Sequence, residues 1–267
     1  MNFLIKIIFR FFSFDNNHKR NGYLLLLLLI LLLGGCHANK KNSTETQENT
    51  FSFPENKIWA HHVNSFKEVE KKHHLFDGLE IDLIYSRHLK DFYVAHHDED
   101  TLKKIMLEDW IYHIPCPEKN WFWLDLKNLN KKNADEIALL LSKILNKYGI
   151  IHKTICEGRN VKALFVLKKE GLAISYWVSR DDSFRKITGN SIWKRKVRRH
   201  INYLQPDAIS CSILMYPLFH TSFPEQNVLY WQIGVPKTPE NVEFTKILCS
   251  IPNVKVVLVD YDKPIPY

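Results

Sequence analysis

An α/β barrel of the TIM type, with parallel strands inside a ring of helices, is the fold that this 267-residue sequence predicts. Two observations predict it. Short strand-like runs alternate with segments of helical periodicity over most of residues 57–262, and such alternation is typical of a parallel sheet covered by helices. The length is also enough for one large buried core. An open, doubly wound sheet is the alternative, because periodicity alone does not distinguish it from a closed barrel.

The composition excludes several other classes of protein. Hydrophobic residues make up 45% and charged residues 25%, which excludes a disordered tail, a collagen-like repeat and a multi-span membrane protein. The net charge is +8, and residues 1–35, with four basic residues and one aspartate, carry +3 of it. The remaining +5 is too weak to indicate a nucleic-acid partner. Neither GxGxxG nor GxxxxGK[ST] occurs in the sequence.

Residues 1–35 predict a secretion signal. Basic residues precede an uncharged apolar run, residues 23–33, that is too short to span a bilayer. The run ends in Leu33-Gly34-Gly35-Cys36, which resembles the lipobox of bacterial lipoproteins. The resemblance implies that Cys36 is lipidated and anchors the mature chain in the bacterial cell envelope. His37 follows, rather than Asp, which favours the outer membrane, facing the periplasm, in a Gram-negative cell. A plain signal-anchor helix is the alternative.

Beyond Cys36 the chain divides into two parts. Residues 36–50 are polar and contain no aromatic residue, so they predict a flexible tether. From residue 51 the apolar content rises and stays high, so residues 51–267 are predicted to form one domain. Its cysteines show no CxxC spacing, which argues against a zinc site. They lie in apolar or strand-like stretches, so buried thiols are favoured over disulfides.

The elements follow in order along the chain. The strand candidates are residues 58–63, 78–85, 91–96, 121–128, 153–156, 172–178, 208–214, 228–233 and 254–260. The helix candidates are residues 65–75, 101–114, 134–148, 161–170, an arm within 184–204, and 239–251. Ser65 with Glu68 fits a capping box, and Gly149 fits a helix stop. Nine strands exceed the eight of a barrel, so residues 91–96 are predicted to be a return strand beside the second barrel strand.

Polar side chains gather on the first four strand candidates and at their ends. They are His61, His62, Glu80, Asp82, His96, His97, Asp125 and Lys127. Barrels of this kind have their active sites at the C-terminal ends of the strands. Residues i and i+2 of a strand face the same way, so Glu80 pairs with Asp82, and Asp125 with Lys127. Helices cover the outside of the barrel, so both pairs are expected to face its axis.

These residue types together indicate a phosphodiester site. Unpaired buried carboxylates are very costly, so the three carboxylates require a cation, and oxygen ligands suit Mg²⁺ or Ca²⁺. Two histidines at the same rim provide an acid and a base, since imidazole titrates near neutral pH. The metal and Lys127 would hold the phosphate oxygens.

The same residues resemble a known pattern. His61-His62-Val63, Glu80-x-Asp82, a strand ending in His96, and Asp125-x-Lys127 resemble the glycerophosphodiester phosphodiesterase superfamily, whose members are PLC-like TIM barrels with a divalent metal. The aromatic Tyr230-Trp231 strand and the last strand, with Asp260 after it, are similar as well. The segment Ala60-His61-His62-Val63-Asn64 is closest to the spider-toxin phospholipase D branch and to the menorin family.

The resemblance implies a role for each matched residue. Glu80, Asp82 and Asp125 would bind one divalent cation, Mg²⁺ or Ca²⁺. His61 and His96 would be the acid–base pair, and His96 is preferred to His97 because it shares a strand face with Val94.

Three further residues would bind substrate. Lys127 would contact the phosphate. Trp231 would line the substrate site, and His62 would partly replace the arginine that common diesterases carry at that position.

The expected function is that of a lipid-anchored, metal-dependent phosphodiesterase acting on a glycerophosphodiester or a phospholipid head group. Either water or a substrate hydroxyl could attack, and the latter would give a cyclic phosphate. The alternatives are a degenerate barrel that acts as a binding module and a structural envelope lipoprotein. Against a degenerate barrel, all six matched site positions carry chemically competent residues.

Overall fold

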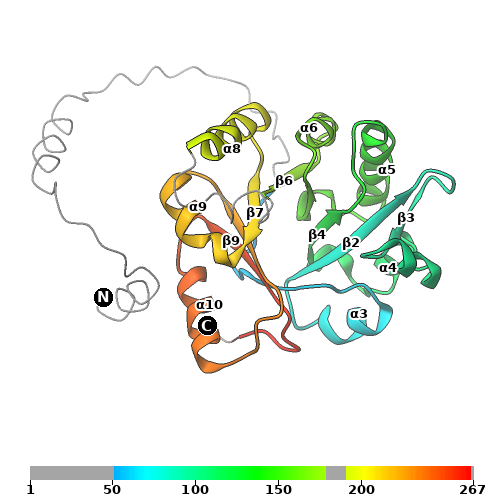
Figure 1. Cartoon of the computed structure of the whole chain (residues 1–267). Helices are drawn as coiled ribbons and strands as arrows, with labels where there is room; N and C mark the ends of the chain where they lie inside the picture. Colours follow the sequence, from blue (N-terminus) through cyan, green and yellow to red (C-terminus); the bar gives the residue numbers. More distant parts are fainter. Residues whose placement is uncertain (1–50, 179–190, 266–267) are drawn as a thin grey trace, which may run out of the picture. The chain divides into compact units, whose positions relative to one another are not determined.

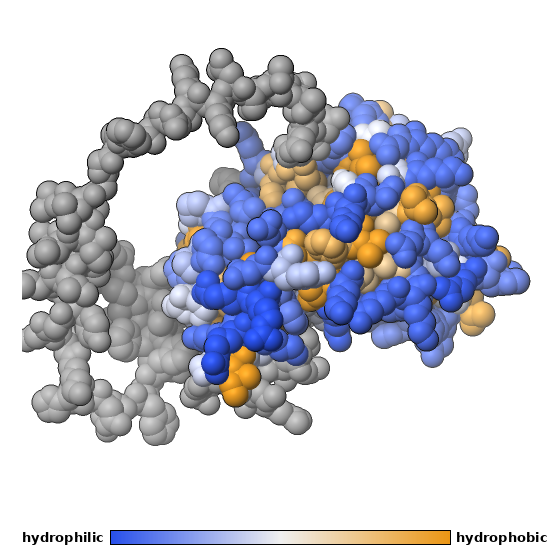
Figure 2. Space-filling view, turned by 90° about the horizontal axis from the view of Figure 1, so that it is seen from above, coloured by the Kyte–Doolittle hydropathy of each residue, from blue (hydrophilic) through white to orange (hydrophobic). Residues whose placement is uncertain are grey.

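The computed structural model describes residues 51–178 and 191–265. By its internal contacts, Asn49–Tyr267 forms one compact unit. The predicted signal, the tether with Cys36 and residues 184–190 of the predicted arm lie outside the described residues. None of the helices in the described ranges is long and apolar enough to cross a membrane. The face seen in Figure 2 is mostly hydrophilic, with apolar side chains in small groups.

Eight parallel strands close into a barrel, which confirms the predicted fold and excludes the open sheet. In order around the barrel they are β1 (Ile58–Ala60), β2 (Gly78–Ser86), β4 (Trp121–Leu126), β5 (Thr154–Gly158), β6 (Ala173–Trp177), β7 (Ala208–Ser212), β8 (Val228–Gln232) and β9 (Val254–Val259). Strand β1 pairs with both β9 and β2 and so completes the closure.

The return strand is confirmed as well. Strand β3 (Asp91–Val94) pairs antiparallel with β2, with Leu83 opposite Val94 and Ser86 opposite Asp91. It lies outside the parallel ring, beside β2 (Figure 1).

Helices surround the strands (Figure 1). They are α3 (Phe66–Lys72), α4 (Leu107–Tyr112), α5 (Ala134–Lys147), α6 (Val161–Lys169), α8 (Ser191–Leu204), α9 (Tyr216–Ser222) and α10 (Pro239–Cys249). Short 3₁₀ helices lie at Asp98–Lys103, Pro117–Lys119, Ile151–Lys153 and Ile213–Met215. The predicted capping box of α3 is half present, because the Ser65 hydroxyl accepts from the Glu68 backbone N–H.

Two of the predicted elements are corrected. The helix predicted at 101–114 is wrong, because Lys104 has a left-handed φ of 51° that ends the 3₁₀ turn, and Met106 then bridges to Tyr93 before α4 begins. The strand predicted at 208–214 ends at Ser212, whose hydroxyl accepts from the backbone of Leu214. Helix α9 follows, with a proline in its first turn, where the missing N–H costs little.

Apolar side chains fill the barrel and the layer between strands and helices. The interior cluster consists of Trp59, Trp123, Ile155, Ala173, Ala208, Leu229, Val256 and Leu258. A Cβ on Gly78 would lie 1.9 Å from the Trp59 ring, so this strand position requires glycine. No disulfide joins the cysteines in the described ranges, and three of them, Cys156, Cys211 and Cys249, are buried.

Candidate active site

One cavity of about 430 Å³ receives side chains from the C-terminal ends of the strands. Its lining includes every predicted site residue except Cys36, which lies outside the described ranges. These are His61, His62, Glu80, Asp82, His96, Asp125, Lys127 and Trp231. Closure of the barrel is what brings them together, because they come from β1, β2, β4, β8 and the segment after β3.

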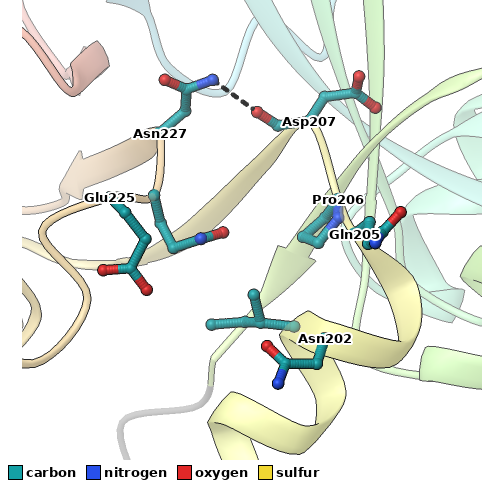
Figure 3. Close-up of a pocket in the computed structure, with 8 residues that line it drawn as sticks. Asn202, Gln205, Pro206, Asp207, Glu225 and Asn227 are labelled. Carbon is teal, nitrogen blue, oxygen red and sulfur yellow. Dashed lines mark hydrogen bonds between the residues drawn. The ribbon is translucent and has the colours of Figure 1, made fainter. Parts of the chain in front are cut away.

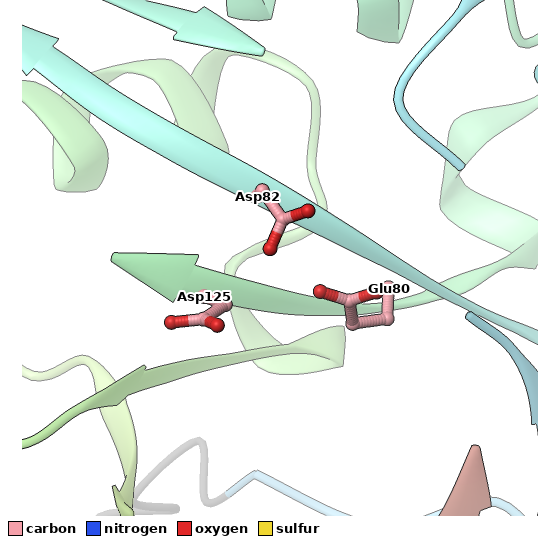
Figure 4. Close-up of side chains that lie close together, drawn as sticks. All are labelled: Glu80, Asp82 and Asp125. Atoms are coloured by element: carbon pink, nitrogen blue, oxygen red, sulfur yellow. The ribbon is translucent and has the colours of Figure 1, made fainter. Parts of the chain in front are cut away.

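Three carboxylates point into a common space (Figure 4). Glu80 and Asp82 share one face of β2, and the register of β2 and β4 places Asp125 opposite Asp82. One oxygen of each lies within 4.8 Å of the others, and all three side chains are buried. Burial, and then the nearby charges of Asp82 and Asp125, raise the pKa of Glu80 well above its usual value. Closely spaced buried oxygens that repel one another fit a hard divalent cation.

Lys127 lies against this cluster. Its ammonium contacts Asp125 at 2.5 Å and also pairs with Asp82. Burial on its own would lower the pKa of Lys127, but the two carboxylates outweigh burial and raise it. Burial raises the pKa of Asp125, while Lys127, and then Arg159, oppose that rise. Lys127 therefore stays charged and neutralises part of the cluster.

The segment after β1 is bound tightly to β2. The backbone N–H of His62 donates to Glu80 Oε2 at 2.7 Å, and His62 has a left-handed φ of 56°. Asn64 Nδ2 donates to Asp82 Oδ2 at 2.5 Å, and the backbone N–H of Asp82 donates to Asn64 Oδ1 at 2.9 Å. The left-handed conformation of His62 is uncommon for a non-glycine residue, and it costs energy that these neighbouring contacts must offset. Asn64 is thus a positioning residue that the sequence did not single out.

His61 is oriented by the last strand. Its Nδ1 lies 2.6 Å from Oδ1 of Asp260, and its Nε2 lies 3.7 Å from Oε2 of Glu80. Asp260 also accepts from the backbone N–H of Gly234 at 2.7 Å. The hydrogen bond from His61 lowers the pKa of Asp260, so this carboxylate is ionised at neutral pH. An ionised partner at Nδ1 favours a proton there, which leaves Nε2 turned to the cavity.

Three further histidines, His62, His96 and His97, line the cavity. The rings of His62 and His96 are 5.8 Å apart, and His96 Nδ1 lies 2.8 Å from His97 Nε2. Burial lowers the pKa of His96, and the charge of Lys127 lowers it further. Both His96 and His97 line the cavity, so the preference for His96 stays a prediction.

Glu157 is a fourth carboxylate that the sequence analysis missed. It lies on β5 directly opposite Asp125, is 3% exposed, and its Oε2 has no hydrogen-bond partner within the described part of the chain. Burial, together with Asp125, raises the pKa of Glu157 well above its usual value. The predicted strand 153–156 ends one residue before Glu157 and two residues before the observed end of β5 at Gly158. A charged residue at the end of a buried strand was the signal that would have found it.

Aromatic and apolar side chains also line the cavity. They are Trp123, Trp177, Trp231, Ile233 and Leu258. The rings of Trp177 and Trp231 are 6.5 Å apart and nearly perpendicular, at 76°. The cavity therefore combines carboxylates that fit a cation with aromatic rings that can contact an organic group.

A second hollow, of about 370 Å³, lies at the other end of the barrel (Figure 3). It is lined by residues at the end of α8 and just before β7 and β8, and Asn227 Nδ2 donates to the backbone oxygen of Asp207 at 3.0 Å. Its lining residues include no histidine and no lysine. The candidate acid–base and metal-binding residues thus lie in the cavity at the C-terminal ends.

Comparison with known proteins gives the fold. No protein-family model and no curated protein matches this sequence. Among solved structures, a phosphodiesterase from Oleispira antarctica in complex with the product sn-glycerol-3-phosphate is similar, with a TM-score of 0.54 and 14% identity over 79% of this chain and 94% of that one. A glycerophosphodiester phosphodiesterase from Parabacteroides distasonis is similar with a TM-score of 0.51 and 14% identity over 76% of this chain and 92% of that one. The chain therefore has the barrel fold of glycerophosphodiester phosphodiesterases, which the sequence resemblance implied.

Proposed function

We propose that this protein is a metal-dependent phosphodiesterase that acts on glycerophosphodiesters or phospholipid head groups. One observation carries the proposal: Glu80, Asp82 and Asp125 converge beside His61 in a single cavity. The fold shared with a phosphodiesterase bound to sn-glycerol-3-phosphate supports the substrate class. A divalent cation, Mg²⁺ or Ca²⁺, held by the three carboxylates would supply positive charge to the phosphate oxygens.

The histidines supply the proton transfers. Asp260 keeps the Nδ1 proton of His61 in place, so Nε2 can accept a proton from the attacking oxygen. His96, which also lines the cavity, is the other member of the acid–base pair and serves the leaving oxygen. The attacking oxygen is that of water or of a neighbouring substrate hydroxyl, and the product distinguishes the two.

The anchor belongs to the same proposal. The Leu33-Gly34-Gly35-Cys36 motif supports lipidation of Cys36, and residues 36–50 would tether the domain to the bacterial envelope. Labelling of cells with a fatty acid, followed by fractionation of wild-type and Cys36→Ser protein, tests this. Label and membrane retention should both be lost in the variant, and retained label in Cys36→Ser would rule out this anchor.

The activity is tested on the full chain in detergent. Phosphorus NMR follows a panel of glycerophosphodiesters and phospholipids with Mg²⁺, Ca²⁺ or EDTA, for the wild type, Glu80→Ala and His61→Ala. His74→Ala is the control, because His74 is exposed and lies just after α3. Turnover should need metal and be lost in the two site variants only. If no diester is turned over and neither metal shifts the melting temperature, the proposal fails and a binding module becomes the better hypothesis.

A further inference from the structure

If the protein has the proposed function, on which this inference rests, a divalent ion and Lys127 do not balance all the negative charge of the cavity and a bound substrate. Five carboxylates line the cavity, namely Glu80, Asp82, Asp100, Asp125 and Glu157. Asp100 is paired with Lys103, and the ammonium of Lys127 is already paired with Asp82 and Asp125. A divalent ion and Lys127 together offset three charges. Even with Glu157 protonated, a bound phosphodiester would leave the site with a negative charge. A further cationic side chain beside the cavity would offset that charge.

Arg159 is an exposed cation beside the cavity. It directly follows β5, the strand that carries Glu157, and so lies at the same end of the barrel as the cavity. Its guanidinium carbon is 3.2 Å from the centre of the Trp177 ring, and Trp177 lines the cavity. Arg159 is also close enough to Asp125 to interact with its charge.

The stacked guanidinium keeps its donors available. An aromatic ring contacts the face of the guanidinium group, while the N–H donors project from its edge. Within the described ranges no carboxylate pairs with Arg159, whereas Arg87 pairs with Glu136 and Arg198 with Glu225. The N–H fork of arginine matches two phosphate oxygens.

We propose that Arg159, held in place by Trp177, binds the phosphate oxygens of the substrate. Trp177 is then a positioning residue, because it fixes the plane of the guanidinium group without touching the phosphate. The acidic cavity would thereby offer an anionic diester two cations, Arg159 and a divalent ion held by the three carboxylates.

Binding of inorganic phosphate to the full chain in the presence of Mg²⁺, measured by titration calorimetry, tests this directly. Arg159→Gln should weaken binding at least about tenfold, because a hydrogen bond to a charged group contributes about 1.5–3 kcal/mol. Arg159→Lys should recover part of the loss, since it keeps the charge but not the fork. Equal dissociation constants for the wild type and Arg159→Gln would overturn the inference.

Lys153→Gln is the matched control. Lys153 stands directly before β5, and its ammonium lies 4.2 Å from the Trp121 ring centre. One strand is thus flanked by two cation–aromatic pairs, and only the pair at its C-terminal end adjoins the cavity. Phosphate binding should be unchanged in Lys153→Gln, and an equal loss in both variants would show a general charge effect instead.

Kinetics separate this inference from the proposed function. If the wild type turns over diesters, Arg159→Gln should raise KM and lower kcat/KM at least about tenfold, and Trp177→Leu should do so to a smaller extent. Unchanged kcat/KM in Arg159→Gln would overturn the inference and leave the proposed function intact. Phosphate binding that depends on Arg159, without turnover of any diester, would support the inference and overturn the proposed function. Absence of both phosphate binding and turnover in the wild type would overturn both.

Discussion

At the scale of single residues, the site depends on side chains that hold others in place. Asp260 orients His61 through a 2.6 Å contact. Asn64 makes two hydrogen bonds with Asp82, one to its carboxylate and one from its backbone. Neither Asp260 nor Asn64 needs to contact a substrate to affect the geometry of the site. Their substitution should change stability and geometry together.

The Asp260–His61 contact should make stability depend on pH. The pKa of Asp260 is lowered in the folded protein, and that of an unfolded aspartate is about 3.9. Between the folded and the unfolded pKa of Asp260, the unfolded chain therefore binds more protons than the folded one. The contribution of Asp260 to stability is present above pH 4 and is lost as pH falls through the folded pKa. Melting temperatures of the wild type and Asp260→Asn between pH 3 and 7 should differ most near neutral pH and converge on acidification.

The control for that measurement is Asp262→Asn, at an exposed aspartate two positions further on. Its difference from the wild type should stay small at every pH. A gap between the wild type and Asp260→Asn that does not narrow below pH 4 would contradict the assigned contact.

Asn64→Ala should destabilise the fold by about 1–3 kcal/mol, because it removes two hydrogen bonds and leaves the Asp82 backbone N–H without its acceptor. Urea unfolding measures the change. Asn146→Ala is the comparison, since Asn146 is exposed and its side chain bonds only within α5. Equal midpoints for the two variants would argue against a structural role for Asn64.

At the scale of elements, the polar ends of the strands depend on the apolar layer beneath them. Glu80 lies beside Trp123 in register, and Trp59 fills the space that Gly78 leaves open. This packing sets the position of β2, and β2 carries two of the three candidate metal ligands.

Gly78→Ala should therefore destabilise the protein by about 1–3 kcal/mol or more, because the new methyl group would overlap the Trp59 ring and force the barrel interior to move. Thermal unfolding followed by circular dichroism measures the loss. Ser86→Ala, at the far end of the same strand, should have little effect. A Gly78→Ala protein as stable as the wild type would show that β2 does not need the close approach to Trp59.

At the scale of the whole molecule, closure of the barrel decides which charges meet. Buried like charges destabilise the fold unless a cation compensates them. The cluster of Glu80, Asp82 and Asp125 has Lys127 as its one lysine or arginine ion-pair partner in the described ranges, so its stability should be linked to metal binding.

Mg²⁺ or Ca²⁺ should raise the melting temperature of the full chain. At a metal concentration of about 100 times the dissociation constant the gain is about 2.7 kcal/mol, which corresponds to several degrees for a domain of this size. The shift should vanish in Asp82→Asn and persist in Glu243→Gln, a change at an exposed carboxylate far along the chain in α10. A shift of equal size in both variants would mean that the ions act elsewhere.

Local sequence patterns determined much of this protein. The spacing of Glu80 with Asp82, and of Asp125 with Lys127, fixes which side chains share a strand face, because a strand repeats every two residues. The alternation of strands and helices predicted a parallel sheet covered by helices, and the pairing of β1 with both β2 and β9 decided that this sheet closes into a barrel. The break at Lys104 was not predictable in this way, since the pairing of Met106 with β3 ends the turn there.

Only the tertiary structure decided the contacts between distant segments. His61 and Asp260 are 199 positions apart, and Glu157 meets Asp125 through the register of β4 and β5. The stacking of Arg159 on Trp177 likewise depends on how β5 and β6 lie side by side. Periodicity reports the direction of a side chain relative to its own strand. Register and closure determine which strands become neighbours, and these follow from the packing of the whole barrel.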